Sequence, residues 1–261
     1  MPGTVYLVGA GPGDPELLTV KAHRLLGEAD TIVHDHLVGP GILELAKPGA
    51  EKIFVGKKAG RVCRPQSQID RLLIELARTG KTVVRLKGGD PFIFGRGGEE
   101  AEALAAAGIP FEIVPGVTAA LAAAAYTGIP LTHREHSSAV VFLTGHEDPS
   151  HTRTRVRWED YARLGATLCI YMGVRSLQGI AQRLQAGGLA PSTPAAIVQS
   201  ATTGAQRHAV GTLATLPTLA EEGGFETPAL VIIGDVARFA GSLAWFDPSQ
   251  LPAESLFRFE P

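Results

Sequence analysis

Asparagine is absent from this 261-residue chain, and cysteine occurs only twice, as Cys63 and Cys169. Two cysteines so far apart in sequence predict neither a disulfide framework nor a C-x-x-C metal site, and a reducing cytoplasm fits this usage. The loss of thermolabile asparagine, together with 18 prolines, is typical of thermophilic proteins, although genome composition produces the same bias.

The chain also lacks an excess of positive charge and a long apolar run. Its 24 basic and 26 acidic residues give a formal charge of -2, which argues against a nucleic-acid-binding face but allows a local basic pocket. The most apolar stretch, residues 117–125, falls well short of the roughly 20 residues that a membrane-spanning helix needs. The first residues lack the basic start of a signal peptide. We therefore expect neither a nucleic-acid partner nor a membrane partner.

The most informative stretch runs from Arg85 to Glu100 and reads RLKGGDPFIFGRGGEE. The β-branched pair Val83-Val84 predicts a strand before it, and the alanine- and glutamate-rich residues 101–107 predict a helix after it. Glycine lets the backbone approach a ligand closely, and open α/β sheets bind ligands beyond the carboxyl ends of their strands. A plain turn needs only about four residues. We interpret the stretch as a binding loop, without a ligand assigned to it.

Glycines or charges also follow three other predicted strands. After the strand expected at residues 5–8, the sequence GAGPGDP places Asp14 where the dinucleotide fingerprint needs its third glycine, so that fingerprint is not met. Asp14 followed by Pro15 instead indicates the start of a helix. A plain turn that joins strand to helix is equally compatible with this sequence. Asp35 ends the strand expected at residues 31–34. The cations of residues 56–61, GKKAGR, suit either an anionic ligand or a solvated loop.

The order of elements predicts an α/β protein with two domains and a ligand cleft between them. Strands alternate with helices up to an irregular segment at residues 127–134, and a second α/β half follows without an internal repeat. We place an N-terminal α/β domain at residues 1–134, a C-terminal α/β domain at 135–246 and a tail at 247–261.

The remaining polar residues narrow the chemistry only to a small-molecule enzyme. The close histidine pairs, His34 with His36 and His133 with His136, have no cysteine beside them and are better explained as structural than as metal ligands. No G-x-S-x-G nucleophile motif occurs. The residues alone do not name the reaction.

Taken together, the motifs resemble the tetrapyrrole (precorrin-type) methyltransferases, and within that family the uroporphyrinogen-III C-methyltransferase branch. The resemblance extends from Val5 to about Phe246, and the run from Arg85 to Glu100 with Thr132-His133-Arg134 is its most specific part. The other motifs that carry it are VGAGPGD at 8–14, DHLV at 35–38, VGKKAG at 55–60, VPGVTA at 114–119, TGIPLTHR at 127–134 and YMG at 171–173.

The resemblance implies a homodimer that binds S-adenosylmethionine in the cleft and methylates uroporphyrinogen III twice, through precorrin-1 to precorrin-2, for sirohaem and cobalamin synthesis. It implies Asp35 as proton acceptor and Lys57 as proton donor. Arg85, Arg96 and Arg134 are our candidates for the substrate carboxylates, because arginine binds carboxylates bidentately. The cofactor-binding positions that it implies are Pro12, Gly88, Gly89, Asp90, Ile93, Thr118, Ala119, Met172, Ala201 and Ala229.

Two positions depart from relatives. His34 stands where tyrosine is frequent, and Ala201 where some relatives have glycine. Some members carry a dehydrogenase–chelatase domain before the methyltransferase; because this chain begins at the first methyltransferase strand, we expect it not to oxidise precorrin-2 or insert iron. Rival interpretations are another precorrin methyltransferase, a diphthine synthase, an rRNA 2′-O-methyltransferase, which the net charge disfavours, and a nucleotide-binding regulatory module, which needs neither Asp35 nor Lys57.

Overall fold

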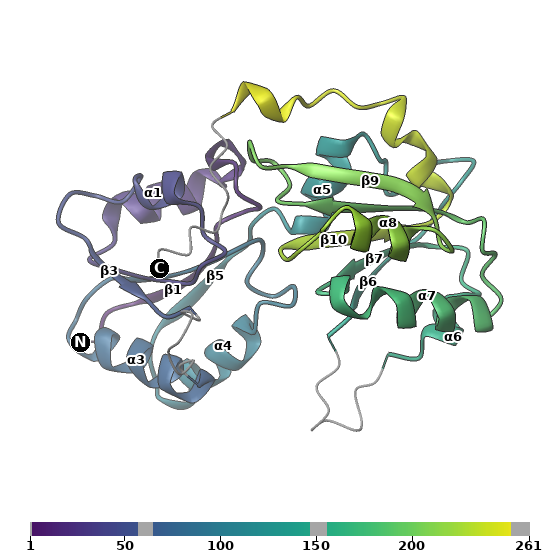
Figure 1. Ribbon diagram of the computed structural model, residues 1–261. Helices are drawn as coiled ribbons and strands as arrows, with labels where there is room; N and C mark the ends of the chain where they lie inside the picture. The colour runs from purple at the N-terminus through teal and green to yellow at the C-terminus, as the bar shows by residue number, and fades with distance from the viewer. Residues whose placement is uncertain (1, 57–64, 147–155, 252–261) are drawn as a thin grey trace. The chain divides into compact units, whose positions relative to one another are not determined.

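The computed structural model describes residues 2–56, 65–146 and 156–251. The chain divides into two compact units, the first ending at Ala119 and the second beginning at Ala120. Each unit contains one five-stranded sheet with helices packed on it (Figure 1). The predicted fold class, α/β with two α/β parts, is confirmed. Within the described ranges, no helix combines the length and the apolar character that crossing a bilayer requires.

The first unit is built on a wholly parallel sheet with strand order β3-β2-β4-β1-β5. Its central strands β2, β4 and β1 are almost wholly buried because helices cover both faces of the sheet. The strands are β1 (Val5–Gly9), β2 (Thr31–His34), β3 (Glu51–Phe54), β4 (Val83–Lys87) and β5 (Phe111–Val114).

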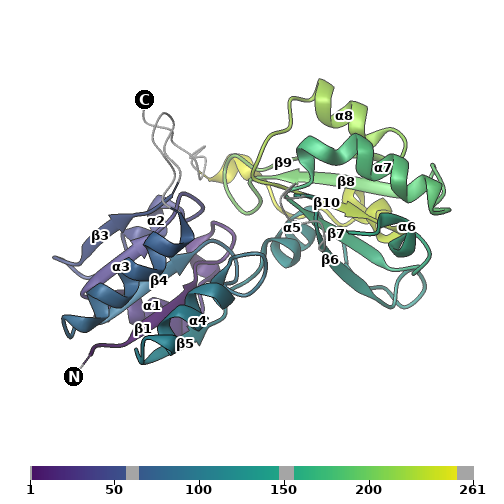
Figure 2. The same cartoon turned by 90° about the horizontal axis from the view of Figure 1, so that it is seen from below.

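Helices α1 (Val20–Glu28) and α2 (Pro40–Leu43) cover one face of this sheet, and α3 (Gln66–Arg78) and α4 (Gly97–Ala106) cover the other (Figures 1 and 2). Alternation along each strand supplies the two cores. On β4, for example, Val84 packs toward α1 and Val83 packs toward α3 and α4.

The helix expected to start at Asp14 and Pro15 begins later. These residues form only a 3-10 turn, η1 (Pro15–Leu17), in which Asp14 accepts a hydrogen bond from the Glu16 amide at 2.9 Å. Leu18 is extended, and Thr19 then caps α1 by accepting from the Ala22 amide at 3.1 Å. A second N-cap signal in the sequence therefore determines where the α-helix starts.

The second unit has a mixed sheet with strand order β6-β7-β10-β8-β9, in which only β6 and β7 are parallel. Its strands are β6 (Val140–Thr144), β7 (Thr167–Tyr171), β8 (Pro194–Gln199), β9 (Arg207–Thr212) and β10 (Ala229–Ile233). Its helices are α5 (Ala119–Thr127), α6 (Trp158–Tyr161), η2 (Val174–Ser176), α7 (Leu177–Ala186), α8 (Leu216–Glu222), η3 (Asp235–Gly241) and η4 (Pro248–Gln250).

Residues 120–134, which the sequence analysis places in the N-terminal domain, pack in the second unit. The alanine face of α5, with Ala120, Ala123 and Ala124, lies in one core with Leu230 and Ile232 of β10. Alanines permit this close approach, but a helix so rich in alanine carries no periodic apolar pattern that assigns it to one domain or the other. Packing therefore divides the chain after Ala119.

Candidate functional site

Three glycine-containing loops contact one another at the carboxyl ends of β1, β4 and β5. The Gly89 amide donates to the Gly11 carbonyl at 2.7 Å, and the Gly11 amide donates to the Gly89 carbonyl at 3.1 Å. A Cβ on Gly9 would lie 2.6 Å from the Gly116 Cα and 2.6 Å from the Gly89 oxygen. We call these loops the glycine edge: residues 9–13, 88–96 and 115–118. It occupies the position where parallel sheets bind ligands.

Asp90 ties two loops of the glycine edge together. Its Oδ2 accepts from the Gly116 amide at 3.0 Å, and its Oδ1 accepts from the Phe92 amide at 2.8 Å. Farther along the loop, Phe94 and Arg96 have left-handed backbones, with φ of 51° and 59°. Such conformations are strained for large side chains and gather at functional sites.

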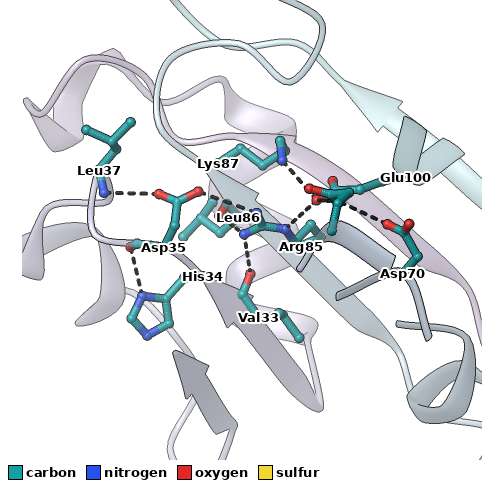
Figure 3. A network of polar contacts seen from close by, with 10 residues as sticks. Val33, His34, Asp35, Leu37, Asp70, Arg85, Leu86, Lys87 and Glu100 are labelled. Atoms are coloured by element: carbon teal, nitrogen blue, oxygen red, sulfur yellow. Dashed lines mark hydrogen bonds and ion pairs between the residues drawn. The ribbon is translucent and has the colours of Figure 1, made fainter. Parts of the chain in front are cut away.

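Asp35 follows β2 beside the glycine edge. Its Oδ1 accepts from the Leu37 amide at 3.0 Å, and its Oδ2 lies 3.4 Å from Arg85 Nη2 (Figure 3). A Cβ on Gly88 would lie 2.5 Å from the Leu37 Cβ, so the Asp35 turn rests on Gly88. The Asp35 side chain keeps 20% exposure. A held but accessible carboxylate can accept a proton from a bound molecule.

Arg85, expected to bind substrate carboxylates, is instead buried, with 3% exposure. It belongs to β4, which continues through Lys87 rather than giving way to a loop at Arg85. Its Nε donates to Glu100 Oε1 at 3.0 Å, and its Nη1 donates to the Leu86 carbonyl at 3.1 Å. Protein acceptors thus engage this guanidinium inside the fold, so the expected contact of Arg85 with substrate carboxylates stays a prediction, and the observed contacts favour an internal role.

Lys87 and Glu100, which the sequence analysis did not single out, complete this buried group (Figure 3). Lys87 Nζ donates to Glu100 Oε1 at 3.0 Å, and Glu100 has no exposed surface. Burial lowers the pKa of Lys87, the Arg85 charge lowers it further, and the Glu100 charge opposes both. The available sequence signal was the pair of cations, Arg85 and Lys87, in a strand whose other residues are apolar.

The other two candidate arginines lie at the surface. Arg96 Nε donates to Glu99 Oε1 at 2.9 Å, and its side chain is 58% exposed. Arg134 is exposed in the turn that the paired residues His133 and Ser137 close. Lys57, the expected proton donor, lies outside the described residues.

The remaining predicted cofactor positions fall into two groups. Pro12, Ile93 and Thr118 lie on the glycine edge, and Ala119 follows it directly. The second group comes together at one end of the second sheet: Met172 follows β7, Ala201 follows β8, and Ala229 begins β10, paired with Gln199. Met172 is 46% exposed and has a left-handed backbone with φ of 54°.

A hollow of about 390 Å³ lies at the opposite end of the second sheet. Its lining includes His136, Thr193, Asp235 and Arg238, and none of the predicted site residues. Asp235 Oδ2 lies 2.6 Å from His136 Nδ1, and its other oxygen accepts from Arg238. Geometry and residue type both favour the glycine edge, rather than this hollow, as the candidate site.

We expect His34→Gln to make the stability of the fold less dependent on pH in mildly acidic solution. Burial lowers the pKa of His34 below its ordinary value of 6.5. Below that pH the unfolded chain binds a proton that the folded chain resists, so the free energy of unfolding falls as the pH falls toward the folded-state pKa. Urea unfolding between about pH 5 and pH 8 measures this slope. His23→Gln, at an exposed position in α1, is the control, and an equal change in both variants would contradict the assignment.

We expect Gly9→Ala to destabilise the fold by about 1–3 kcal/mol, because the added methyl group would overlap backbone atoms that cannot rotate away. Gly27→Ala is the matched control. A Cβ at this exposed position of α1 would meet no atom within 4 Å, so the substitution should stabilise by about 0.5–1 kcal/mol. Urea unfolding compares the two, and a neutral Gly9→Ala would show that the three loops do not pack this tightly.

Comparisons with known proteins show to which family the chain belongs. The family model of the tetrapyrrole (corrin/porphyrin) methylases matches residues 4–217. A siroheme synthase of Ectopseudomonas mendocina is 54% identical over 249 residues, which are 95% of this chain and 53% of that protein. The chain thus spans about half the length of the curated relatives that it matches.

Solved structures match over nearly their whole length. Uroporphyrin-III-C-methyltransferase of Thermus thermophilus is 43% identical with a TM-score of 0.78, covering 95% of this chain and 99% of that one. Another structure of that enzyme is complexed with S-adenyl homocysteine. A cobalt precorrin-4 methyltransferase is 29% identical with a TM-score of 0.80, covering 90% of this chain and 95% of that one. The chain belongs to the tetrapyrrole methylase family.

Proposed function

We propose that this chain is an S-adenosylmethionine-dependent C-methyltransferase that methylates uroporphyrinogen III twice, through precorrin-1, to precorrin-2. The observation that carries the proposal is the held, partly exposed Asp35 carboxylate beside the glycine edge. The same chain is 43% identical to an enzyme named for this activity. Precorrin-2 would then serve sirohaem and cobalamin synthesis.

The residues of the glycine edge fit the cofactor. Gly88 and Gly89 present backbone without a Cβ, and Asp90 fixes the loop that would enclose the ligand. When bound, S-adenosylmethionine supplies an electrophilic methyl group. The chain then has to hold the two reactants in line and exclude water. We keep the cofactor-binding roles of Pro12, Gly88, Gly89, Asp90, Ile93, Thr118, Ala119, Met172, Ala201 and Ala229 as part of this proposal.

Proton removal is the chemical task of the protein. The macrocycle must lose a proton after a carbon gains a methyl group, and a carboxylate at hydrogen-bond reach can take it. We assign this role to Asp35 and the proton-donor role to Lys57. Arg96 and Arg134, both exposed, are the proposed contacts for substrate carboxylates, because guanidinium forks match carboxylate geometry.

An acceptor panel tests the proposal against its rival within the family. The chain is incubated anaerobically with S-adenosylmethionine carrying a labelled methyl group and either uroporphyrinogen III or cobalt-precorrin-4. The similarity to the cobalt precorrin-4 methyltransferase favours the second acceptor, and the higher identity to the Thermus enzyme favours the first. We expect label in uroporphyrinogen III. Label only in cobalt-precorrin-4 would move the substrate to a later step.

A further inference from the structure

We propose that Glu100 and Arg85 are positioning residues that hold Asp35 in its catalytic orientation: Glu100 fixes the Arg85 guanidinium, and Arg85 fixes the Asp35 carboxylate. This inference rests on the proposed role of Asp35 as proton acceptor. It adds two residues to the reaction that would contact neither the substrate nor the cofactor.

The contacts form one continuous chain (Figure 3). At one end of the guanidinium, Arg85 Nη2 lies 3.4 Å from Asp35 Oδ2; on its other side, Arg85 Nε donates to Glu100 Oε1 at 3.0 Å. Arg85 Nη1 also reaches the carbonyls of Val33 and Leu86, at 3.4 and 3.1 Å. These contacts fix the plane of the guanidinium, which therefore limits the orientations that the carboxylate of Asp35 can take.

Glu100 is the anchor of this chain. It is completely buried, and one oxygen, Oε1, accepts from Arg85, Lys87 and the Gln66 amide, the last at 3.2 Å. No described residue forms a hydrogen bond with the other oxygen, Oε2. Burying charge in this way is costly, and apolar residues of similar size often replace such groups without loss of stability. A buried ionic group therefore indicates a purpose other than stability.

The position of the group points to that purpose. On the same face of the sheet, the surrounding core is apolar, with Leu7, Leu73, Val83 and Leu104 all buried. The charged side chains come from the last residues of β4 and the first turn of α4, and they reach Asp35, the residue that follows β2. These side chains therefore lie where they can hold the Asp35 carboxylate in place. Such support matters because a base misplaced by 1 Å can cost about a hundredfold in rate.

Arg85→Lys separates positioning from charge. Lysine keeps the positive charge, but a single ammonium lacks the planar fork that joins two carboxylates. We expect Arg85→Lys and Glu100→Gln each to lower kcat for methyl transfer by about 10- to 100-fold. The KM for S-adenosylmethionine should stay within about twofold of the wild-type value, because the substitutions should slow catalysis without weakening the binding of the cofactor. Full activity of Arg85→Lys would show that charge alone suffices.

A double-mutant cycle tests whether the two residues act through Asp35. In an Asp35→Asn background, we expect neither Glu100→Gln nor Arg85→Lys to lower the single-turnover rate further, because residues that act as a unit are not additive. Losses that add in full would overturn the inference. Arg85→Lys carries the cycle if Glu100→Gln does not fold, and circular dichroism checks each variant.

Glu159→Gln is the matched control, because Glu159 also pairs with an arginine, Arg183 at 2.9 Å, but in the second unit and with 43% exposure. We expect wild-type kcat for this variant. If the wild-type chain methylates uroporphyrinogen III but the losses in the double-mutant cycle add in full, the inference fails and the proposed function stands. A wild-type chain that transfers no methyl group to uroporphyrinogen III would remove the proposed function and this inference with it.

Discussion

Asp35→Asn is expected to lower kcat for methylation of uroporphyrinogen III by about 10²–10⁴-fold, the range that a positioned general base contributes. The amide keeps the size of the carboxylate and its contact with the Leu37 amide, but it accepts a proton far less readily. Binding of S-adenosylhomocysteine, measured by calorimetry, should not change. The experiment thereby separates loss of chemistry from loss of the cofactor site.

The control for this experiment lies at the other end of the same segment. Asp30 precedes β2, where it accepts from Lys47 at 2.8 Å and from the Thr82 amide at 2.9 Å, away from the glycine edge. Asp30→Asn should keep the wild-type kcat. If both variants keep the wild-type kcat, a group other than Asp35 removes the proton. If Asp35→Asn instead loses the cofactor, Asp35 belongs to binding rather than to proton transfer.

Glu100→Ala is expected to destabilise the fold by about 3–5 kcal/mol, the usual cost of removing one partner from a buried ionic group. The substitution leaves Arg85 and Lys87 buried, each at 3% exposure, without the oxygen that both now share. Urea unfolding at neutral pH measures the loss. The expected cost arises because two buried cations lose the carboxylate that they share, so it is consistent with a group that contributes little net stability when complete.

Glu159→Ala is the control for this loss. The Arg183–Glu159 pair is more than a third exposed on both sides, and exposed pairs contribute little because water screens them. We therefore expect a much smaller loss than for Glu100→Ala. Equal losses of stability in the two variants would mean that the burial of Glu100 does not raise the cost of removing its carboxylate. A stable Glu100→Ala would require that water reaches Arg85 and Lys87.

Local sequence patterns predicted the α/β class and the position of the glycine edge. Parallel strands place their carboxyl ends on one edge, so Gly89 and Asp90 after β4 had to lie near Gly11 after β1. Asp35 was placed on the same rim by the same reasoning. In these cases the parallel arrangement of the strands determines where the loops after them lie, and no knowledge of side-chain packing is needed.

The buried ionic group could not be predicted in this way. Arginine at the start of a glycine-rich run reads as a surface ligand for anions, and only the continuation of β4 through Lys87 turns Arg85 inward. Glu100 reads as a first-turn acidic residue that complements the helix dipole. Its burial depends on which face of α4 meets the sheet, which tertiary packing decides.

The assignment of α5 failed to follow from the sequence for a similar reason. A run of alanines is compatible with burial on any side, so its place in the core with Leu230 and Ile232 is determined by contacts between segments far apart in sequence. The effect on the candidate site is small, because Thr118 and Ala119 close the loop that links β5 to α5 in either division.

The mass of the product tests the central claim most directly. The chain is incubated anaerobically with uroporphyrinogen III and excess S-adenosylmethionine, and the tetrapyrrole is followed by mass spectrometry over time. We predict a transient species with one added methyl group, followed by accumulation of a product with two. An unchanged uroporphyrinogen III, in a sample that still binds S-adenosylhomocysteine, would contradict the proposed function.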